Sequence, residues 1–453
     1  MNSTSPTGSV VRLAYGRSGL DLRLPIPATI IRPCHAPPLA DARGSLRGAL
    51  QKPGSGPALR DLVPAGARVG VSICDVTRPF PGALVLPVLL DEIPGAAVTV
   101  FIATGTHRAS TAEELVRMLG ASTLGRVEVV QHDAFALADH REVCSIGASG
   151  QPALIDRRFL DQDVRITLGF IEPHFFAGFS GGPKMVAPGL ASIDTVIELH
   201  SASRIADPRA TFGILDGNPV HEAIEQVASA VDIAFALDVS LDAEKRITDV
   251  FAGRPWEAHR AGCEVVRATS MVPVDEPFDI VVTTNSGYPL DLNLYQTVKG
   301  ICAADGIVRS GGTILVASEC SDGLPDHGRY GALLASHAGP ADYLRALEAG
   351  QVRTHDQWQV QKQALVLERA RVMVHASGLD SDALRAAWFE PVADLAAALR
   401  RLAEDHGPGC RVAVLPEGPQ TIAYLALDAR TARGAPPPCE NPKRLAAASI
   451  NRR

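Results

Sequence analysis

The chain has 453 residues, of which 46% are hydrophobic and 21% charged, a composition typical of a folded protein with two or three domains. Fifty acidic residues against 43 Lys and Arg leave a formal net charge of −7. Such a balance argues against broad nucleic-acid binding, because neutralising phosphates normally needs a clustered basic surplus. No apolar run reaches the ~20 residues of a membrane span, and the N-terminus lacks the apolar stretch of a secretory signal. We therefore expect a soluble, cytoplasmic protein that binds neither nucleic acid nor membrane.

The cysteines are scattered, and no two of them form a C-x-x-C pair. A zinc knuckle, a redox dithiol or a dense disulfide frame is therefore not expected, and most of the thiols should be reduced and buried. If the protein binds a metal, its soft ligands should not come from the sulfur of this chain.

The first predicted elements alternate between strands and helices. Residues 1 to about 66 are rich in Pro, Gly and Ser and are expected to form edge strands and connections. Apolar runs then predict strands at 68–74, 97–103 and 164–171. Between the last two, Ser110 followed three residues later by Glu113 predicts a helix start with a capping box. Strands separated by helices indicate βαβ units and a mainly parallel sheet.

A second series of strands follows a polar, Pro-containing segment at 272–277. Its apolar runs are 278–284, 312–317, 370–375 and 411–415. The fold class we predict is α/β, with two α/β domains of mainly parallel sheets and an active-site crevice between them. The domains are expected at 1–272 and 273–430, and the Pro-rich, then basic, residues 431–453 are expected to be disordered.

Polar clusters follow the first three predicted strands directly. These clusters are Asp75-Val-Thr-Arg78, Thr104-Gly-Thr-His107 and the segment from Glu172 to Lys184. Ligands of open parallel sheets bind just beyond the carboxyl ends of the strands. We therefore expect Arg78, His107, His174 and Lys184 to converge on one crevice.

The segment Gly178-Phe-Ser-Gly-Gly-Pro-Lys184 has the composition of a phosphate loop. Its glycines allow close backbone approach, and successive free N–H groups can hold an anion. It is not a Walker A loop, because Pro183 separates glycine from lysine and Met185 replaces the Ser or Thr that binds Mg²⁺. A plain tight turn remains the alternative.

Each histidine has a functional and a structural interpretation. His174 lies between Pro173 and two phenylalanines, a rigid and partly apolar wall that would lower its pKa and keep it available as a base. A satisfied core histidine is the alternative there, and a solvated loop histidine is the alternative for His107. His200 ends a predicted amphipathic helix, where a core or surface position is commoner than a ligand.

The second domain offers polar side chains on a predicted helix. Tyr295 and Lys299 are four residues apart and share a face, with Gln296 beside them. These groups suit a small carboxylate, although a capped surface helix would look similar. Trp358 stands in a polar segment, either as a packing edge or as a pocket wall.

Taken together, these clusters resemble the lactate racemase family, whose members use a nickel-pincer nucleotide. Order and spacing agree over roughly residues 10 to 425. The matching pieces are Asp75-Val-Thr-Arg-Pro79, Ala103-Thr-Gly-Thr-His-Arg108, His174-Phe-Phe-Ala-Gly-Phe-Ser-Gly-Gly-Pro-Lys184, His200, Gly287-Tyr-Pro-Leu-Asp-Leu-Asn-Leu-Tyr-Gln-Thr-Val-Lys-Gly300 and Asp356-Gln-Trp358.

The resemblance implies a role for each matching residue. Lys184 would be joined covalently to the cofactor, a pyridinium thioamide/thiocarboxylate mononucleotide made by separate synthesis enzymes, and His200 would be the one protein ligand of nickel. His107 and His174 would be the paired acid/bases. The remaining assignments are Asp75, Thr77, Gly178, Ser180, Gly181 and Gly182 for the nucleotide, and Arg78, Tyr295, Gln296, Lys299 and Trp358 for the substrate.

The implied activity is a nickel-dependent isomerase, a racemase or epimerase of a 2-hydroxy acid. The α hydrogen would move reversibly as hydride to the cofactor, through a 2-keto acid, while the histidines handle the hydroxyl proton. Lactate-acting members tend to carry an aromatic at the position of Thr106 and a histidine at that of Val76. Smaller side chains here would admit a substrate larger than lactate, such as a dicarboxylate, aryl or sugar acid.

Two other functions fit part of the pattern. A nicotinamide-dependent 2-hydroxyacid dehydrogenase also needs His and Arg on an α/β fold, but the G-x-G-x-x-G loop with a downstream acidic residue is missing. A non-catalytic carrier of the pincer cofactor would need Lys184 but not paired histidines with two cationic groups.

Overall fold

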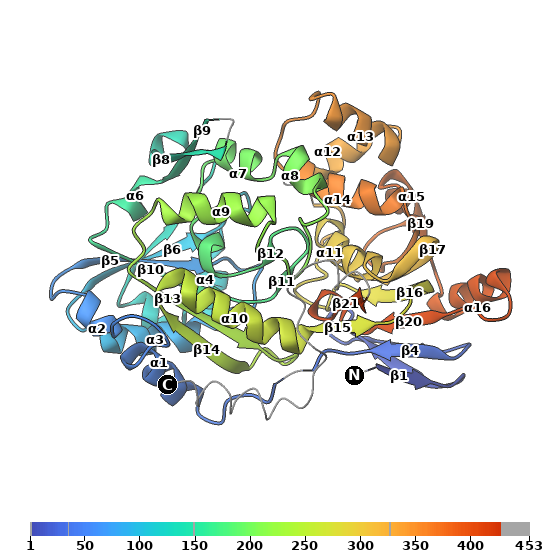
Figure 1. Ribbon diagram of the computed structural model, residues 1–453, viewed down its shortest axis with the longest axis horizontal. Coiled ribbons are helices and arrows are strands. Elements are labelled where there is room, and N and C mark those ends of the chain that lie inside the picture. The colour runs from blue at the N-terminus through green and yellow to red at the C-terminus, as the bar shows by residue number, and fades with distance from the viewer. Residues whose placement is uncertain (1, 35, 148–149, 326–327, 427–453) are drawn as a thin grey trace. The chain divides into compact units, whose positions relative to one another are not determined.

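The computed structural model describes residues 2–34, 36–147, 150–325 and 328–426 (Figure 1). Contacts within the chain divide it into two compact units. Unit 1 comprises residues 1–36, 267–352 and 359–453, and unit 2 comprises residues 37–266 and 353–358. The predicted tail at 431–453 lies outside the described residues.

Unit 2 is built on a six-stranded sheet in the order β14-β13-β10-β5-β6-β7. All neighbours pair in parallel except β14, which runs antiparallel to β13. The strands are β5 (Arg68–Cys74), β6 (Ala97–Ala103), β7 (Glu128–Gln131), β10 (Val164–Phe170), β13 (Phe235–Leu241) and β14 (Ile247–Gly253). The strands predicted at 68–74 and 97–103 are confirmed, and the one predicted at 164–171 ends one residue earlier.

The other elements of unit 2 cover and connect this sheet. They are α1 (Ala42–Gln51), α2 (Leu59–Leu62), α3 (Gly82–Glu92), α4 (Ala112–Leu119), α5 (Ala121–Leu124), η1 (Leu137–Asp139), β8 (His140–Ile146), β9 (Gln151–Asp156), α6 (Arg157–Leu160), β11 (Pro173–His174), β12 (Gly178–Phe179), η3 (Gly182–Met185), α7 (Ile193–Leu199), α8 (Ala202–Ala206), α9 (Pro219–Ser229) and α10 (Pro255–Ser270), whose last turn belongs to unit 1.

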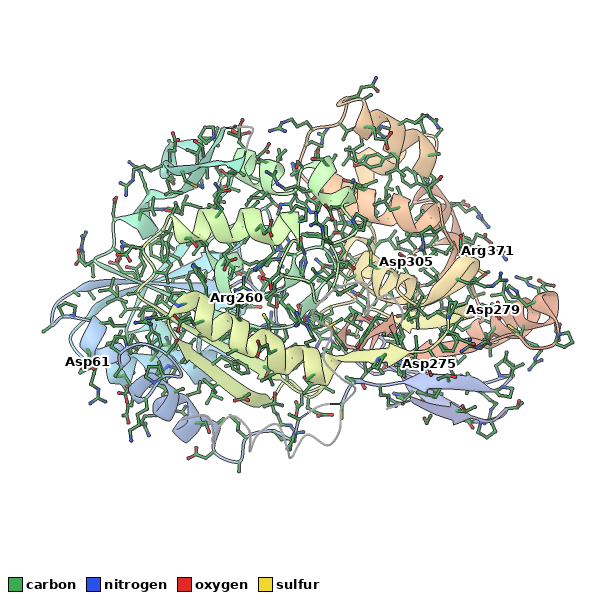
Figure 2. All side chains as sticks on the ribbon, viewed as in Figure 1. Asp61, Arg260, Asp275, Asp279, Asp305 and Arg371 are labelled. Carbon is green, nitrogen blue, oxygen red and sulfur yellow. The ribbon has the colours of Figure 1, made fainter. Side chains whose placement is uncertain are left out.

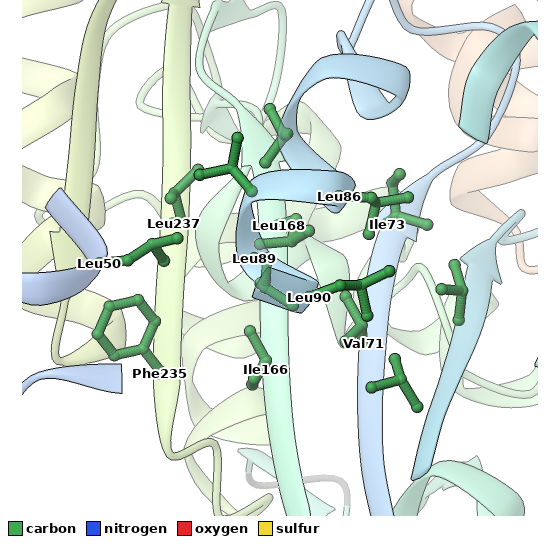
Figure 3. Packing of buried hydrophobic residues seen from close by; sticks show 14 of the residues in the cluster. Leu50, Val71, Ile73, Leu86, Leu89, Leu90, Ile166, Leu168, Phe235 and Leu237 are labelled. Atoms are coloured by element: carbon green, nitrogen blue, oxygen red, sulfur yellow. The ribbon is translucent and has the colours of Figure 1, made fainter. Parts of the chain in front are cut away.

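The core of unit 2 lies between the sheet and helices α1 and α3. Figure 3 shows Leu86, Leu89 and Leu90 of α3 facing strand residues such as Leu168 and Val71. Burying a leucine completely contributes roughly 1.5–3 kcal/mol, so this apolar layer holds the central strands in place. Figure 1 shows α9 and α10 lying in front of the same sheet.

Surface charges on these helices are paired. Figure 2 labels Arg260 on α10, whose guanidinium lies 2.8 Å from Asp216 Oδ1 and 3.4 Å from Glu225 Oε2. Exposed pairs of this kind contribute about 0–1 kcal/mol each, so the apolar layer, not the surface charge, dominates the stability of the unit.

The predicted helix start near residue 110 was wrong by one residue. Helix α4 has Thr111 as its N-cap, and the capping box joins Thr111 to Glu114. Both Ser110 and Thr111 precede a Glu at the required spacing, but the Ser110 N–H donates to Gln131 Oε1 instead. The hydrogen bond from Arg108 is the main reason that the pKa of Glu114 falls to about 2.

The first 66 residues contain two helices besides the expected strands. Helix α1 begins after Asp41, whose side chain accepts the Gly44 N–H, and it buries Leu46 and Leu50. Residues 1–36 belong to unit 1, because β4 (Ala28–Ile31) pairs in parallel with β20 (Val412–Leu415).

Unit 1 is built on a seven-stranded sheet in the order β1-β4-β20-β16-β17-β18-β19, parallel except for β1. The strand predicted at 278–284 is confirmed as β16, and the other three predicted runs fall on β17, β18 and β20. Besides β4 and β20, the elements of unit 1, sheet strands included, are β1 (Asn2–Ser5), β2 (Val10–Leu13), β3 (Leu20–Arg23), β15 (Met271–Val274), β16 (Phe278–Thr284), α11 (Leu294–Asp305), β17 (Val308–Ala317), α12 (Tyr330–Ala335), α13 (Pro340–Glu348), α14 (Gln357–Leu367, beginning in unit 2), β18 (Arg371–His375), α15 (Ser381–Ala386), β19 (Glu390–Pro391), α16 (Leu395–His406), η4 (Gly418–Gln420) and β21 (Ile422–Leu425).

Within the described ranges, no helix has the length and apolar character needed to cross a bilayer. The cysteines that the structure describes are all free thiols.

Candidate active site

Three polar segments of unit 2 begin at adjacent strand ends. Strand β5 lies between β10 and β6 and is parallel to both. The segments that start at Asp75, Thr104 and Glu172 therefore leave the sheet at the same edge, within a few residues of each strand's carboxyl end. This arrangement confirms the strand-end pattern expected from the sequence.

Asp75 and His107 are joined by a short hydrogen bond at this edge. The buried Asp75 accepts a hydrogen bond from His107 Nδ1 to Oδ2 at 2.7 Å, and the Thr77 hydroxyl donates to Oδ1 at 2.7 Å. Burial raises the pKa of Asp75, but His107, Arg78 and the Thr77 hydroxyl together outweigh burial and lower it. Because the ionised carboxylate can only accept, Nδ1 of His107 is the donor and Nε2 keeps its lone pair when the ring is neutral.

Arg78 is held beside the same group. Its Nη1 donates to Thr77 Oγ1 at 3.1 Å, and its Nε lies 3.8 Å from Glu172 Oε1 in the segment that follows β10. The guanidinium side chain is 17% exposed, so a small anion can still reach it. The Arg78 fork is therefore fixed between the segments that follow β5 and β10.

His174 is buried against two phenylalanines. Its Nδ1 accepts the N–H groups of Phe176 at 3.5 Å and Ala177 at 3.3 Å. Because a backbone N–H can only donate, a neutral His174 carries its proton on Nε2. When both rings are neutral, His174 and His107 are therefore in different tautomers.

The ring of Phe176 brings three of the candidate residues together. His174 lies 4.5 Å and His200 5.1 Å from it between ring centroids, and Lys184 Nζ lies 5.5 Å from its centroid. The sequence motif contains Phe176, but we did not assign it a role. The sequence signal for Phe176 is its place in an aromatic pair directly after a histidine.

His200 directly follows helix α7, at the C-cap position. Its Nδ1 donates to Val196 O at 2.7 Å, which leaves the lone pair on Nε2. Burial lowers the pKa of His200 to about 3, and the charges of Lys184 and Arg204 act in the same direction. The side chain is a neutral imidazole, oriented by a backbone carbonyl, as metal-ligating histidines usually are.

Trp358 covers His200 within unit 2. Its ring lies 4.7 Å from the His200 ring, and Gln357 Nε2 donates to His200 O at 3.5 Å. Arg353 anchors the start of this segment 3.4 Å from Glu198 Oε2. Trp358 is 5% exposed and packs on His200, and its assignment to the substrate pocket stays a prediction.

The glycine loop before Lys184 is buried from Gly178 to Pro183. Backbone donors of the loop bond within the protein: Ser180 N donates to Glu172 O, and Gly182 N donates to Asp238 Oδ1. The loop thus fixes the backbone at Lys184. Phosphate binding by Gly178, Ser180, Gly181 and Gly182 stays a prediction.

The three candidates of unit 1 lie on helix α11, as predicted. Asn293 caps the helix, and Lys299 Nζ donates to Gln296 Oε1 at 2.6 Å. The Tyr295 ring meets the Tyr330 ring edge-on at 5.4 Å. The shared helix face is confirmed, and its role in substrate binding stays a prediction.

Among the residues with described positions, no three His, Cys, Asp or Glu side chains gather to hold a metal ion.

The matched family models define the class of protein as a racemase-type isomerase with two α/β parts. The lactate racemase N-terminal domain matches residues 15–213, and the lactate racemase C-terminal domain matches residues 274–423. The chain belongs to the lactate racemase family.

Individual relatives agree over most of the chain. The lactate racemase of Thermoanaerobacterium thermosaccharolyticum is 34% identical over 83% of this chain and 89% of its own, and that of Lactiplantibacillus plantarum is 36% identical over 80% and 86%. The structure of the apoprotein from the first organism superposes with a TM-score of 0.85 and 32% identity, covering 92% of this chain and 100% of that one. A Thermotoga maritima protein shares the fold at 19% identity, with a TM-score of 0.68.

Proposed function

We propose that the protein is a racemase or epimerase of a 2-hydroxy acid, with a nickel-pincer nucleotide attached to Lys184. The observation that carries this proposal is the placement of an amine and a neutral imidazole, Lys184 and His200, around the single ring of Phe176. Family membership supports the same activity.

The residues of unit 2 fit such a cofactor. Lys184 offers a primary amine for the thioamide link, and His200 Nε2 offers the lone pair of a neutral ring to nickel. A pincer ring that brings its own sulfur and carbon donors suits a site where His, Cys, Asp and Glu do not cluster among the described residues. Asp75 and Thr77 are assigned to the ribose or phosphate, with the glycine loop.

The chemistry that this group supplies when bound is reversible removal of the α hydrogen as hydride, which avoids a carbanion beside a carboxylate. Separate synthesis enzymes would provide the group. The protein's own contribution is position, charge and proton handling.

His107 and His174 are assigned to the hydroxyl proton. The ionised Asp75 holds the His107 ring so that Nε2 can accept the proton of a substrate hydroxyl. His174 carries its proton on Nε2, so the pair offers one acceptor and one donor, which the hydroxy and keto forms of the substrate require in turn.

Arg78 is assigned to the substrate carboxylate together with Lys299, and Tyr295, Gln296 and Trp358 are assigned to the pocket lining. Replacing Arg78 with Gln should raise KM about 10- to 100-fold with a smaller change in kcat, because it removes a charge-assisted bond made in ground and transition states. Steady-state rates would measure this. Arg108→Gln is the control, since Arg108 pairs with Glu114 on the surface. An unchanged KM in the Arg78 variant would rule out the carboxylate clamp.

Substrate size follows from two half-buried side chains, Val76 and Thr106, next to the Asp75–His107 pair. Both are smaller than the side chains that the resemblance associates with lactate. We expect the holoenzyme to racemise a larger 2-hydroxy acid faster than lactate. A panel of lactate, dicarboxylate, aryl and sugar acids, resolved by chiral chromatography, tests this. Lactate as the sole good substrate would refute the larger pocket.

A further inference from the structure

A buried carboxyl group lies behind the loop that presents Lys184. Asp238, in the middle of β13, is 1% exposed, and its Oδ1 accepts the Gly182 N–H at 3.1 Å. None of the residues that the structure describes offers Oδ2 a hydrogen-bond partner. A buried carboxyl with one oxygen unpaired is costly, and nothing in the assigned chemistry uses Asp238.

The neighbouring residues leave room for this carboxyl. Gly169 faces Asp238 in the register of β10 and β13, and a Cβ there would lie 2.0 Å from Asp238 Oδ1. A Cβ at Gly181, where φ is +76°, would lie 2.8 Å from the same oxygen. Side chains at these two positions would displace the carboxyl from the loop.

A second buried side chain holds the loop through another backbone group. His259 of α10 is 2% exposed, and its Nε2 donates to Ser180 O at 2.9 Å. Its ring occupies the space beside Gly182, where a Cβ would lie 2.3 Å from Cγ. The loop is therefore bonded at Ser180 O and Gly182 N, four and two residues before Lys184.

We propose that Asp238 is a positioning residue for Lys184: its carboxyl fixes the Gly182 peptide and thereby the direction in which the amine leaves the loop, toward Phe176. The consequence for cofactor attachment rests on the proposed function of Lys184. The fixing of the loop does not depend on it.

We expect the neutral amide of Asn to take over the role of the Asp238 carboxyl in the loop. Burial raises the pKa of the carboxyl to about 7, so its neutral form is populated near neutral pH. Asp238→Asn keeps an oxygen for the Gly182 N–H, whereas Asp238→Ala leaves that N–H without its acceptor. Ser240→Ala is a matched control, because Ser240 lies on the same strand as Asp238 and the substitution removes a part-buried side-chain bond to Thr248 of β14 without touching the loop.

Hydrogen–deuterium exchange of the apoprotein tests the loop directly. In Asp238→Ala, peptides covering residues 178–186 should exchange about ten-fold faster, while Asp238→Asn and Ser240→Ala should match the unaltered protein. The proposal would be overturned if peptides 178–186 exchanged as slowly in Asp238→Ala as in the unaltered protein. It would also be overturned if Ser240→Ala accelerated their exchange as much as Asp238→Ala does.

Intact mass of protein made together with the cofactor-synthesis enzymes tests the consequence. Below the melting temperature of every variant, Asp238→Ala should carry about ten-fold less adduct, and Asp238→Asn should restore it. Full adduct in Asp238→Ala would show that the loop bond does not position Lys184. No adduct on the unaltered protein would instead count against the proposed function, and the exchange result would still decide the role of Asp238 in the loop.

Discussion

Replacing either His107 or His174 with Asn should lower kcat by roughly 10²- to 10⁴-fold, the usual contribution of a positioned acid or base. Asn can keep the contacts made by Nδ1, to Asp75 in one case and to the Ala177 N–H in the other, but it lacks the Nε2 atom of the ring. KM should change much less. Initial rates in both directions, followed by chiral chromatography, measure the loss.

The matched control is His375→Asn, which alters a half-buried histidine of unit 1 bonded through Nδ1 to Val392 O. It should leave kcat within a few-fold, and the His107 and His174 variants should keep the cofactor adduct. If both His107→Asn and His174→Asn kept their turnover, the two histidines would be excluded as the groups that transfer the proton. If the unaltered protein bound the cofactor but converted no substrate, it would be the non-catalytic carrier that the sequence left as an alternative.

Replacing His200 with Ala should lower the nickel content at least ten-fold while the adduct on Lys184 remains. Because Nδ1 donates to Val196 O, the neutral ring keeps its Nε2 lone pair available for the metal that we propose. Elemental analysis together with intact mass separates the two effects, since Lys184 is unchanged in this variant.

His221→Ala is the control for that experiment. His221 is also buried, and burial likewise lowers its pKa to about 3, yet it has no assigned role. The nickel content of His221→Ala should match that of the unaltered protein. Unchanged nickel in His200→Ala would exclude His200 as the ligand.

Much of the architecture was predictable because it depends on local apolar runs. The segments 68–74, 97–103 and 278–284 are strands at those limits, since each is a short run rich in apolar residues that is followed by a polar residue. The strand-end rule then placed the polar segments at one edge of the unit 2 sheet. The helix face shared by Tyr295 and Lys299 followed from a spacing of four.

The remaining features depend on contacts between distant segments, which a single sequence does not show. The Asp75–His107 bond joins residues 32 apart, and the assignment of the His107 tautomer depends on it. The role of Phe176 as the common neighbour of His174, Lys184 and His200 was likewise not visible. Asp238 did leave a signal, a lone acidic residue inside the apolar run Phe235–Leu241, which we did not use.

The central claim is that Lys184 carries the cofactor covalently, and intact-mass spectrometry of protein made together with the cofactor-synthesis enzymes tests it most directly. The account predicts a nickel-containing adduct on the unaltered protein and none on Lys184→Ala, with Lys184→Ala still folded by its melting curve. An adduct that persists on Lys184→Ala, or an unaltered protein that racemises its substrate without any adduct, would contradict it.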